Sequence, residues 1–296
     1  MRTVLVSARL AVPAVLTAAG LLLAGCSDPD EGGASGDLAV VTSFYPLQFV
    51  TERVAGPAVT VRNLTKAGAE PHDLELGPRD VADLGDADLV VYLAGFQPAV
   101  DTAVEQEASD TGYDVAPAAR LDREADPHFW LDPTRLADVA DAVADRLAAL
   151  DAADATDFRR NATTLRAELA ELDAEMSAGL ADCASTDLVT SHTAFGYLAE
   201  RYRLTQRGIT GLTPEDEPSS ADLAAVADFV TANEVRTIYA ETLVSPAVAE
   251  TLARETGTRT AVLDPLEGLD ESSAGRDYLA VMRANLATLR DGQVCR

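Results

Sequence analysis

The chain has 296 residues, of which 49 are Asp or Glu and 23 are Lys or Arg, so its formal net charge at pH 7 is −26. A body this acidic repels nucleic acid and anionic lipid surfaces, which excludes both as binding partners. The length is enough for one large domain or for two lobes of ordinary size. A cationic ligand fits the charge, although an acidic surface that aids solubility explains most of it.

The first 25 residues have the pattern of an export signal, which is removed from the mature protein. Arg2 and Arg9 provide a basic start, and an almost wholly apolar run follows over residues 10–23. The run ends in Leu-Ala-Gly-Cys, which has the form of a lipobox, so we expect cleavage before Cys26 and acylation of its thiol. The alternatives are a plain signal peptide followed by a chance cysteine, or a membrane-spanning anchor. For an anchor the run is shorter than the roughly 20 residues that a bilayer core needs.

Residues 26–37 are small and polar after the cysteine, which predicts a flexible tether between the lipid and the folded part. We therefore expect an extracytoplasmic monomer that is attached to the cell membrane only through its lipid. With Cys26 lipidated, Cys183 and Cys295 remain as an even pair in an oxidising compartment, which predicts a disulfide between them. Two unpaired thiols are the alternative.

Short β-rich runs then alternate with helical patterns, which predicts an α/β protein with mainly parallel sheets. The expected strands are residues 39–43, 59–64 and 88–93 in the first half, and 187–190, 236–240 and 259–263 in the second. Ser219 and Asp222 form the pattern of a capping box, whereas Ser245 and Pro246 are placed to start another helix that Gly257 would end. The two halves are alike in plan, which indicates two α/β lobes.

Between the halves, apolar residues recur at helical spacing, and no Gly or Pro interrupts residues 154–178. A single helix over this segment would be about 40 Å long, the breadth of a lobe or more. We predict a rigid linker helix over residues 154–181 that joins a lobe of residues 38–153 to a lobe of residues 182–296. A helical hairpin inside one domain is the alternative.

The chain contains three histidines, His72, His128 and His192. His72 lies just beyond the second expected strand, and His192 lies where a strand passes into a helix. His128 follows a long loop and precedes a helix whose first residues include Pro133. Ligands of open α/β sheets bind outside the carboxyl ends of the strands, so we expect these histidines to face one cleft.

Two carboxylates, Glu241 and Asp264, follow strands in the second half. Three neutral imidazoles and one carboxylate form a tetrahedral ligand set for zinc. Manganese prefers more oxygen ligands and a higher coordination number, so a third imidazole shifts the preference towards zinc. The intervals of 56 and 64 residues between the histidines match no local metal motif, so spacing alone is a weak signal.

Five blocks of sequence add to this signal. They are Glu70-Pro71-His72-Asp73, the eight residues Asp126 to Pro133, the eight residues Ser191 to Leu198, the nine residues Gly211 to Ser219, and Leu263-Asp264-Pro265-Leu266. In this order they resemble the signature blocks of the ZnuA/TroA-type substrate-binding lipoproteins of zinc and manganese ABC importers. The likeness runs from about Val40 to the C-terminus.

The resemblance implies two α/β lobes joined by one rigid helix, with the metal in the cleft between them. It implies that His72 and His128 bind the metal from the first lobe. His192 and Asp264 would bind it from the second. The fourth ligand varies across the family, so Glu70, Glu241 or a water molecule are alternatives to Asp264.

One departure from the family concerns the stretch before the second ligand. Members dedicated to zinc often carry a histidine-rich acidic loop there, whereas residues 105–125 are acidic but contain no histidine. We therefore expect no accessory zinc-collecting role for this stretch.

The resemblance implies a protein that is not an enzyme, captures Zn²⁺ outside the cytoplasm, and delivers it to an ABC-type permease with a cytoplasmic ATPase. Mn²⁺ in the same role is the nearest alternative. A zinc hydrolase, with Glu241 activating water, is a second one, but the sequence lacks a compact catalytic motif such as His-Glu-x-x-His. A binder of a metal chelate is a third one. It would need several arginines or aromatic side chains in the cleft, and only 5% of residues are aromatic.

Overall fold

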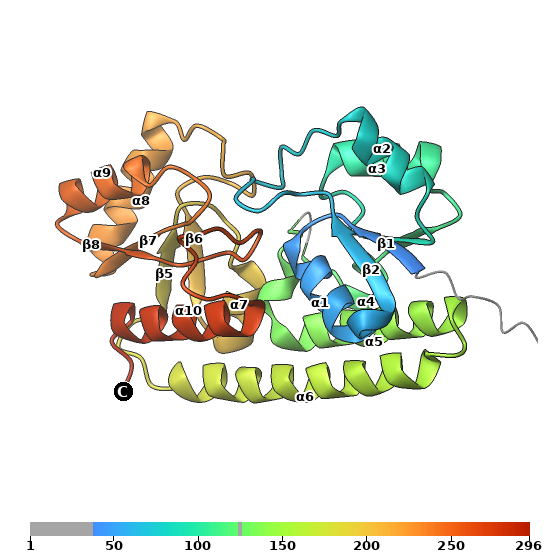
Figure 1. The fold of residues 1–296 in the computed structure, drawn as a ribbon. Helices are drawn as coiled ribbons and strands as arrows, with labels where there is room; N and C mark the ends of the chain where they lie inside the picture. Colours follow the sequence, from blue (N-terminus) through green and yellow to red (C-terminus); the bar gives the residue numbers. More distant parts are fainter. Residues whose placement is uncertain (1–37, 124–125) are drawn as a thin grey trace, which may run out of the picture. The chain divides into compact units, whose positions relative to one another are not determined.

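The computed structural model describes residues 38–123 and 126–296 (Figure 1). The expected export signal, the expected lipidation site at Cys26 and the expected tether fall within residues 1–37 and lie outside the described residues. No helix in the described part of the chain combines the length and the hydropathy that crossing a bilayer requires.

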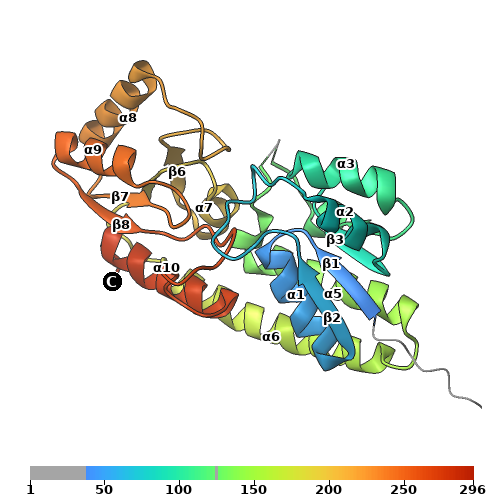
Figure 2. The same ribbon diagram turned by 45° about the horizontal axis from the view of Figure 1, so that its top comes forward.

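The first half folds around a parallel sheet with the strand order β2-β1-β3-β4. Its strands are β1 (Leu38–Thr42), β2 (Val59–Asn63), β3 (Leu89–Tyr92) and β4 (Gly112–Asp114). Its helices are α1 (Tyr45–Ala55), α2 (Pro78–Gly85), α3 (Pro98–Glu107), α4 (Ala116–Ala119) and α5 (Pro133–Leu150), with the 3-10 turns η1 (Gly56–Ala58) and η2 (Phe129–Leu131). Helices α2 and α3 cover one face of the sheet, and α1, α4 and α5 cover the other (Figures 1 and 2).

The second half repeats this plan, with the strand order β6-β5-β7-β8 in a second parallel sheet. Its strands are β5 (Asp187–Thr190), β6 (Thr205–Gly208), β7 (Thr237–Ala240) and β8 (Arg259–Val262). Its helices are α7 (Gly196–Tyr202), α8 (Ser220–Ala232), α9 (Ala247–Thr256) and α10 (Tyr278–Gly292). Helices α8 and α9 lie on one face, and α7 and α10 on the other (Figure 1). The predicted fold class, two α/β lobes with parallel sheets, is confirmed.

All six expected strands are present, but β4 and β6 were not predicted. Both are short strands at a sheet edge, and their side chains are partly or fully exposed, so neither shows an apolar run. The helix signals mostly hold: Ser219 caps α8 in a capping box with Asp222, and Gly257 ends α9 at φ 72°. The predicted start of α9 is wrong by one residue, because Pro246 occupies the N-cap position and not the first turn.

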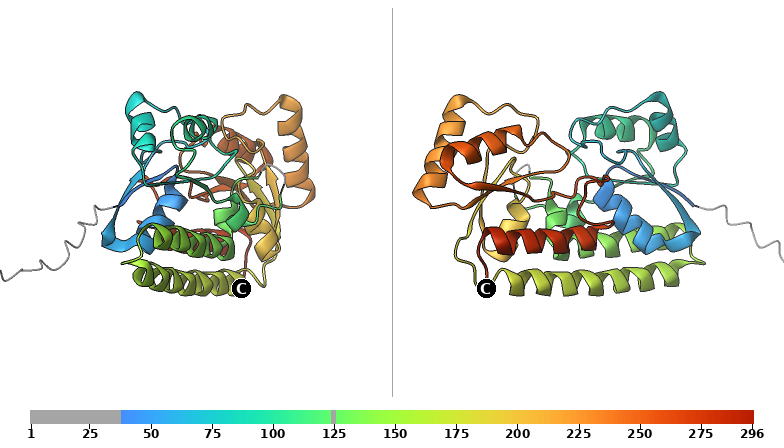
Figure 3. Two further views of the ribbon diagram at one scale, coloured as in Figure 1. Left: turned by 90° about the vertical axis from the view of Figure 1, so that its right-hand side faces the viewer. Right: turned by 60° about the vertical axis from the view of Figure 1, so that its left-hand side comes forward.

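The linker segment forms one continuous helix, α6 (Ala155–Gly179). It packs against α5 and α1 of the first half and against α10 of the second, so it runs alongside both lobes (Figures 1 and 3). Its apolar stripe is fully or nearly fully buried and comprises Phe158, Ala162, Leu165, Leu169, Leu172 and Met176. Helices α5 and α6 therefore form a helical hairpin, and α6 also contacts α10 of the second half.

One continuous hydrophobic core lies on the α6 side of both sheets and includes residues of both lobes, whereas two smaller cores lie under α2–α3 and under α8–α9. Each large apolar side chain in such a core contributes roughly 1.5 to 3 kcal/mol, so moving the lobes apart would expose surface that stabilises the fold. A disulfide joins Cys183 to Cys295 across 112 residues, as predicted. In the loop-entropy model, such a disulfide raises the free energy of unfolding by about 3 to 5 kcal/mol.

Candidate metal centre

The three histidines meet at one point together with a carboxylate that the sequence analysis did not select, Glu267. Each of the four side chains offers one ligand atom, and these four atoms lie within 4.8 Å of one another. His128 and His192 are fully buried, Glu267 is nearly so, and the side chain of His72 is 10% exposed. We call this group, His72, His128, His192 and Glu267, the His3Glu cluster.

Four of the distances between the ligand atoms are close to those of a tetrahedral zinc site. Oε1 of Glu267 lies 3.0 Å from Nε2 of His128, 3.3 Å from Nε2 of His192 and 3.5 Å from Nε2 of His72. The Nε2 atoms of His128 and His192 are 3.4 Å apart. Ligand atoms bound at about 2.0 to 2.2 Å around a tetrahedral zinc lie about 3.3 to 3.6 Å from each other. Small shifts would therefore bring all four atoms into bonding distance of one ion.

His72 lies in the loop between β2 and α2, and neighbouring side chains fix this loop. The buried amide of Gln97 donates hydrogen bonds to the backbone oxygen of Pro71 and to Oγ1 of Thr65, both at 3.1 Å. The imidazole of His72 packs edge-on against Phe96, with the ring centres 4.8 Å apart. Nε2 of His72 is buried and has no hydrogen-bond partner among the described residues. Nε2 of His72 can therefore act as a metal ligand of the cluster.

His128 and His192 are each held by a carboxylate on the ring nitrogen that faces away from the cluster. Nδ1 of His128 lies 2.9 Å from Oδ1 of Asp126, and Nδ1 of His192 is hydrogen-bonded to Oε2 of Glu241. The backbone N–H of His192 also donates to Glu241, at 3.0 Å. A histidine that donates Nδ1–H to a carboxylate presents Nε2 as its metal ligand.

Glu267 reaches the cluster because the chain turns sharply after β8. Leu266 has a φ of 61°, in the left-handed region, and its N–H donates to Oδ1 of Asp264 at 2.8 Å. Asn285 of α10 binds the backbone N–H and C=O of Asp264, at 3.0 and 2.7 Å. Trp130 donates to the backbone oxygen of Pro265 at 2.8 Å. The loop is fixed from both sides, and the turn directs Glu267 at the histidines.

The other carboxylates that the sequence analysis considered as fourth ligand lie outside the His3Glu cluster. Asp264 is buried, and its Oδ1 accepts the N–H of Leu266. Oε2 of Glu70 accepts the N–H groups of His72 and Asp73, at 2.8 and 3.4 Å. Glu241 binds the far side of His192. All three support the loops that carry the donors, so the structure favours Glu267 over Asp264 as the fourth donor.

Asp264 was expected as the fourth ligand because it directly follows the last predicted strand and belongs to the Leu263-Asp264-Pro265-Leu266 block that resembles the family's signature. Glu267 comes three residues later, and it reaches the cluster only through the left-handed turn at Leu266. A leucine seldom takes a positive φ, so no residue type in the sequence marks this turn. The sole available signal was a second carboxylate close behind the Leu263-Asp264-Pro265-Leu266 block.

The hydrogen bonds within the cluster keep Glu267 negatively charged. Burial alone lowers the pKa of His192, but its hydrogen bonds to Glu241 and Glu267 outweigh burial and raise the pKa to about 10. The pKa of His128 is raised too, by Asp126 and Glu267 against the effect of burial. Burial raises the pKa of Glu267, yet its histidine donors outweigh this and hold the pKa well below the ordinary value. Glu267 thus stays ionised in a buried position where positive charge compensates it.

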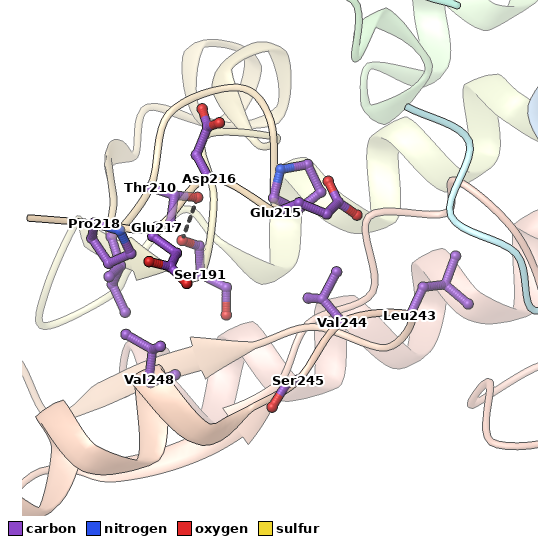
Figure 4. A pocket seen from close by; sticks show the side chains of 13 residues that line it. Ser191, Thr210, Glu215, Asp216, Glu217, Pro218, Leu243, Val244, Ser245 and Val248 are labelled. Atoms are coloured by element: carbon purple, nitrogen blue, oxygen red, sulfur yellow. Dashed lines mark hydrogen bonds between the residues drawn. The ribbon is translucent and has the colours of Figure 1, made fainter. Parts of the chain in front are cut away.

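A separate pocket with a volume of about 420 Å³ lies in the second lobe. It opens between the loop of Glu215 to Pro218 and the segment Leu243 to Val248 (Figure 4). Ser191, the neighbour of His192 in the chain, lines it, but the described residues of its wall include no member of the His3Glu cluster. The His3Glu cluster is therefore distinct from this pocket.

With this geometry established, comparison with known proteins identifies the family. Residues 40–292 match the family model described as "Zinc-uptake complex component A periplasmic". The chain belongs to this family. The resemblance inferred from the five sequence blocks is confirmed, and this family consists of binding proteins and not of enzymes.

Three similar proteins illustrate the likeness. The chain is 37% identical to the zinc-binding protein AdcA of Streptococcus pyogenes serotype M6, an alignment that covers 87% of this chain and 56% of that protein. It is 33% identical to the high-affinity zinc uptake system protein ZnuA of Bacillus subtilis, covering 94% and 95% of the two chains. The Zn(II)-bound ZnuA-like domain of Streptococcus pneumoniae AdcA superimposes with a TM-score of 0.75 at 36% identity, covering 87% of this chain and 99% of that one. The chain thus spans little more than half the length of AdcA.

Proposed function

We propose that this protein captures Zn²⁺ outside the cytoplasm and delivers it to an ABC-type importer. The observation that carries the proposal is the His3Glu cluster, in which four distances between ligand atoms are 3.0 to 3.5 Å, close to those in a zinc tetrahedron. We propose all four residues as ligands, with Glu267 in the place that the sequence analysis gave to Asp264. The names of the relatives support zinc as the cargo.

The ligand set also argues against the alternatives. Mn²⁺ prefers a higher coordination number and more oxygen, whereas the cluster supplies three nitrogens and one carboxylate. A hydrolytic zinc site keeps one position open for water, whereas four protein ligands close the shell. A closed shell suits a protein that holds the ion and passes it on.

The partners follow from the same proposal. The family is that of a component of a zinc-uptake complex, which supports a permease and its cytoplasmic ATPase as the proteins that receive the ion. We propose that the lipobox cysteine, Cys26, anchors the protein to the membrane. We also propose that residues 38–153 and 182–296 are the two lobes, with the linker helix in residues 154–181.

Titration of the purified protein with zinc tests this function. At pH 8 one Zn²⁺ is expected to bind per chain, more tightly than Mn²⁺. The affinity is expected to rise with pH up to about 10, the raised pKa of His192. The reason is that Zn²⁺ binds neutral imidazole, and the raised pKa of His192 means that zinc must displace a proton in this range.

Calorimetry in two buffers of different ionisation enthalpy measures both the affinity and the protons released. Competition with a chelator of known affinity extends the range if binding is too tight for direct titration. Absence of zinc binding, or tighter binding of Mn²⁺ than of Zn²⁺, would contradict the proposed function.

A further inference from the structure

Asp126 lies in the chain two residues before His128 and holds its imidazole. Oδ1 of Asp126 is 2.9 Å from Nδ1 of His128 and also accepts the backbone N–H of His128 at 3.1 Å. The opposite ring nitrogen, Nε2, lies 3.0 Å from Glu267 in the cluster. Asp126 is buried, so this contact is shielded from water. With Nδ1–H donating to Asp126, Nε2 is left as the metal-binding nitrogen.

Asp126 is in turn held by Arg123, which reaches across to the second lobe. Nε of Arg123 lies 3.3 Å from the other carboxylate oxygen of Asp126. Nη1 of the same guanidinium lies 3.0 Å from Glu200 of α7. The guanidinium also lies over the ring of Tyr197 of α7, 5.8 Å from its centre. Asp126 and Arg123, which orient His128 of the first half, are therefore held in place by α7 of the second half.

Gly196, the first residue of α7, makes this approach possible. A Cβ atom at this position would lie 2.4 Å from Oδ2 of Asp126 and 2.8 Å from Nε of Arg123. Both distances are shorter than any van der Waals contact. Any other residue at position 196 would force the Asp126–Arg123 pair away from α7, so the close packing of this pair depends on glycine.

The equivalent contact on the second lobe is built differently. Glu241 follows β7 and His192 follows β5, and these two strands are neighbours in one sheet. The orientation of His192 is thus fixed within its own lobe. The orientation of His128 depends instead on how α7 packs against the loop of Arg123 and Asp126.

We propose that Asp126 is a positioning residue of the metal centre, and that Arg123 and Gly196 make its hold on His128 depend on the contact between the lobes. This inference rests on the proposed function, because it assumes that His128 binds zinc through Nε2. Zinc affinity then requires α7 to be in place. A displacement of α7 would loosen His128 without touching any ligand directly.

Zinc affinities of four variants test the proposal. Asp126→Ala is expected to weaken binding about 10- to 100-fold, the usual effect of losing a carboxylate partner of a ligating histidine. Asp126→Asn should retain most of the affinity, because an amide oxygen still accepts Nδ1–H. Gly196→Ala should weaken binding although every polar partner remains. Asp122→Ala is the matched control, because this exposed carboxylate in the same loop pairs with Arg135 instead, and it should leave the affinity unchanged.

A second readout separates positioning from a general loss of structure. In nitrogen NMR spectra of the zinc-loaded protein, Nδ1 of His128 should be protonated in all variants. Its proton should exchange slowly with water in the wild type and in Asp126→Asn, and rapidly in Asp126→Ala, where no side-chain oxygen accepts it. Arg123→Gln, at a half-exposed position, provides a variant with little risk to folding and should weaken binding in the same direction.

The outcomes distinguish the two proposals. The positioning role would be overturned if the wild type binds zinc and Asp126→Ala, Arg123→Gln and Gly196→Ala bind it with the same affinity. The proposed function would then still hold. An Asp126→Asn variant that binds zinc as weakly as Asp126→Ala, with the His128 Nδ1 proton exchanging equally slowly in both, would overturn the positioning role as well. Failure of the wild type to bind zinc would instead remove the proposed function.

Discussion

Replacing His192 by alanine is expected to weaken zinc binding by about 100- to 1000-fold. Structural zinc sites with four ligands bind with roughly 10 to 16 kcal/mol, so one ligand accounts for about 2.5 to 4 kcal/mol of this. The zinc-free variant should remain folded. The imidazole of His192 is not one of the apolar side chains that form the hydrophobic cores of the second lobe.

Chelator competition measures the affinity of His192→Ala, and thermal unfolding of the zinc-free protein measures its stability. Thr193→Ala is a suitable control, because Thr193 is the next residue in the chain and its hydroxyl binds the backbone oxygen of Thr210, away from the cluster. An affinity equal to that of the wild type in His192→Ala would exclude His192 as a ligand.

Glu267→Gln is expected to weaken zinc binding by a similar factor, about 100-fold or more. It removes the cluster's only negative charge and replaces a strong zinc ligand by a weak one. Asp264→Asn should lower the affinity by less than about tenfold, because Asn still accepts the hydrogen bond of the Leu266 N–H. The pair of variants therefore decides between the carboxylate that the sequence indicated and the one that the structure places in the cluster.

The same chelator competition applies to both variants, with zinc-free unfolding as the check on folding. Burial raises the pKa of Asp264 to about 6, so the fold stabilises the carboxylate anion less than water does. A neutral Asn at this position should therefore be tolerated. A large loss in Asp264→Asn together with a small loss in Glu267→Gln would contradict the assignment of the fourth ligand.

The lobes and the linker helix could be predicted from sequence because their signals are local and repeated. The apolar runs of β1, β3, β5 and β7 are buried strands, and the stripe from Phe158 to Met176 shows one helix face. Strands β4 and β6 escaped prediction because their sequences, Gly-Tyr-Asp and Thr-Gln-Arg-Gly, contain few of the β-branched and apolar residues that mark the other two edge strands, β2 and β8. Their presence depends on pairing with a neighbour, which is a tertiary property.

The three histidines could be predicted to meet because all of them follow strands or open helices on the ligand-binding edge of an α/β fold. The position of Glu267, the proposed fourth ligand, could not be predicted, because it depends on one left-handed residue, Leu266, and on contacts from Trp130 and Asn285. Those contacts link residues 130 and 285 to the loop after β8. The local sequence of that loop does not predict these contacts.

A crystal structure of the zinc-loaded protein tests most directly whether the four donors bind one ion. We expect a single Zn²⁺ with Nε2 of His72, His128 and His192 and one carboxylate oxygen of Glu267 at about 2.0 to 2.2 Å. Zinc held by other residues, or a shell in which Glu267 is replaced by Asp264 or by water, would contradict this assignment.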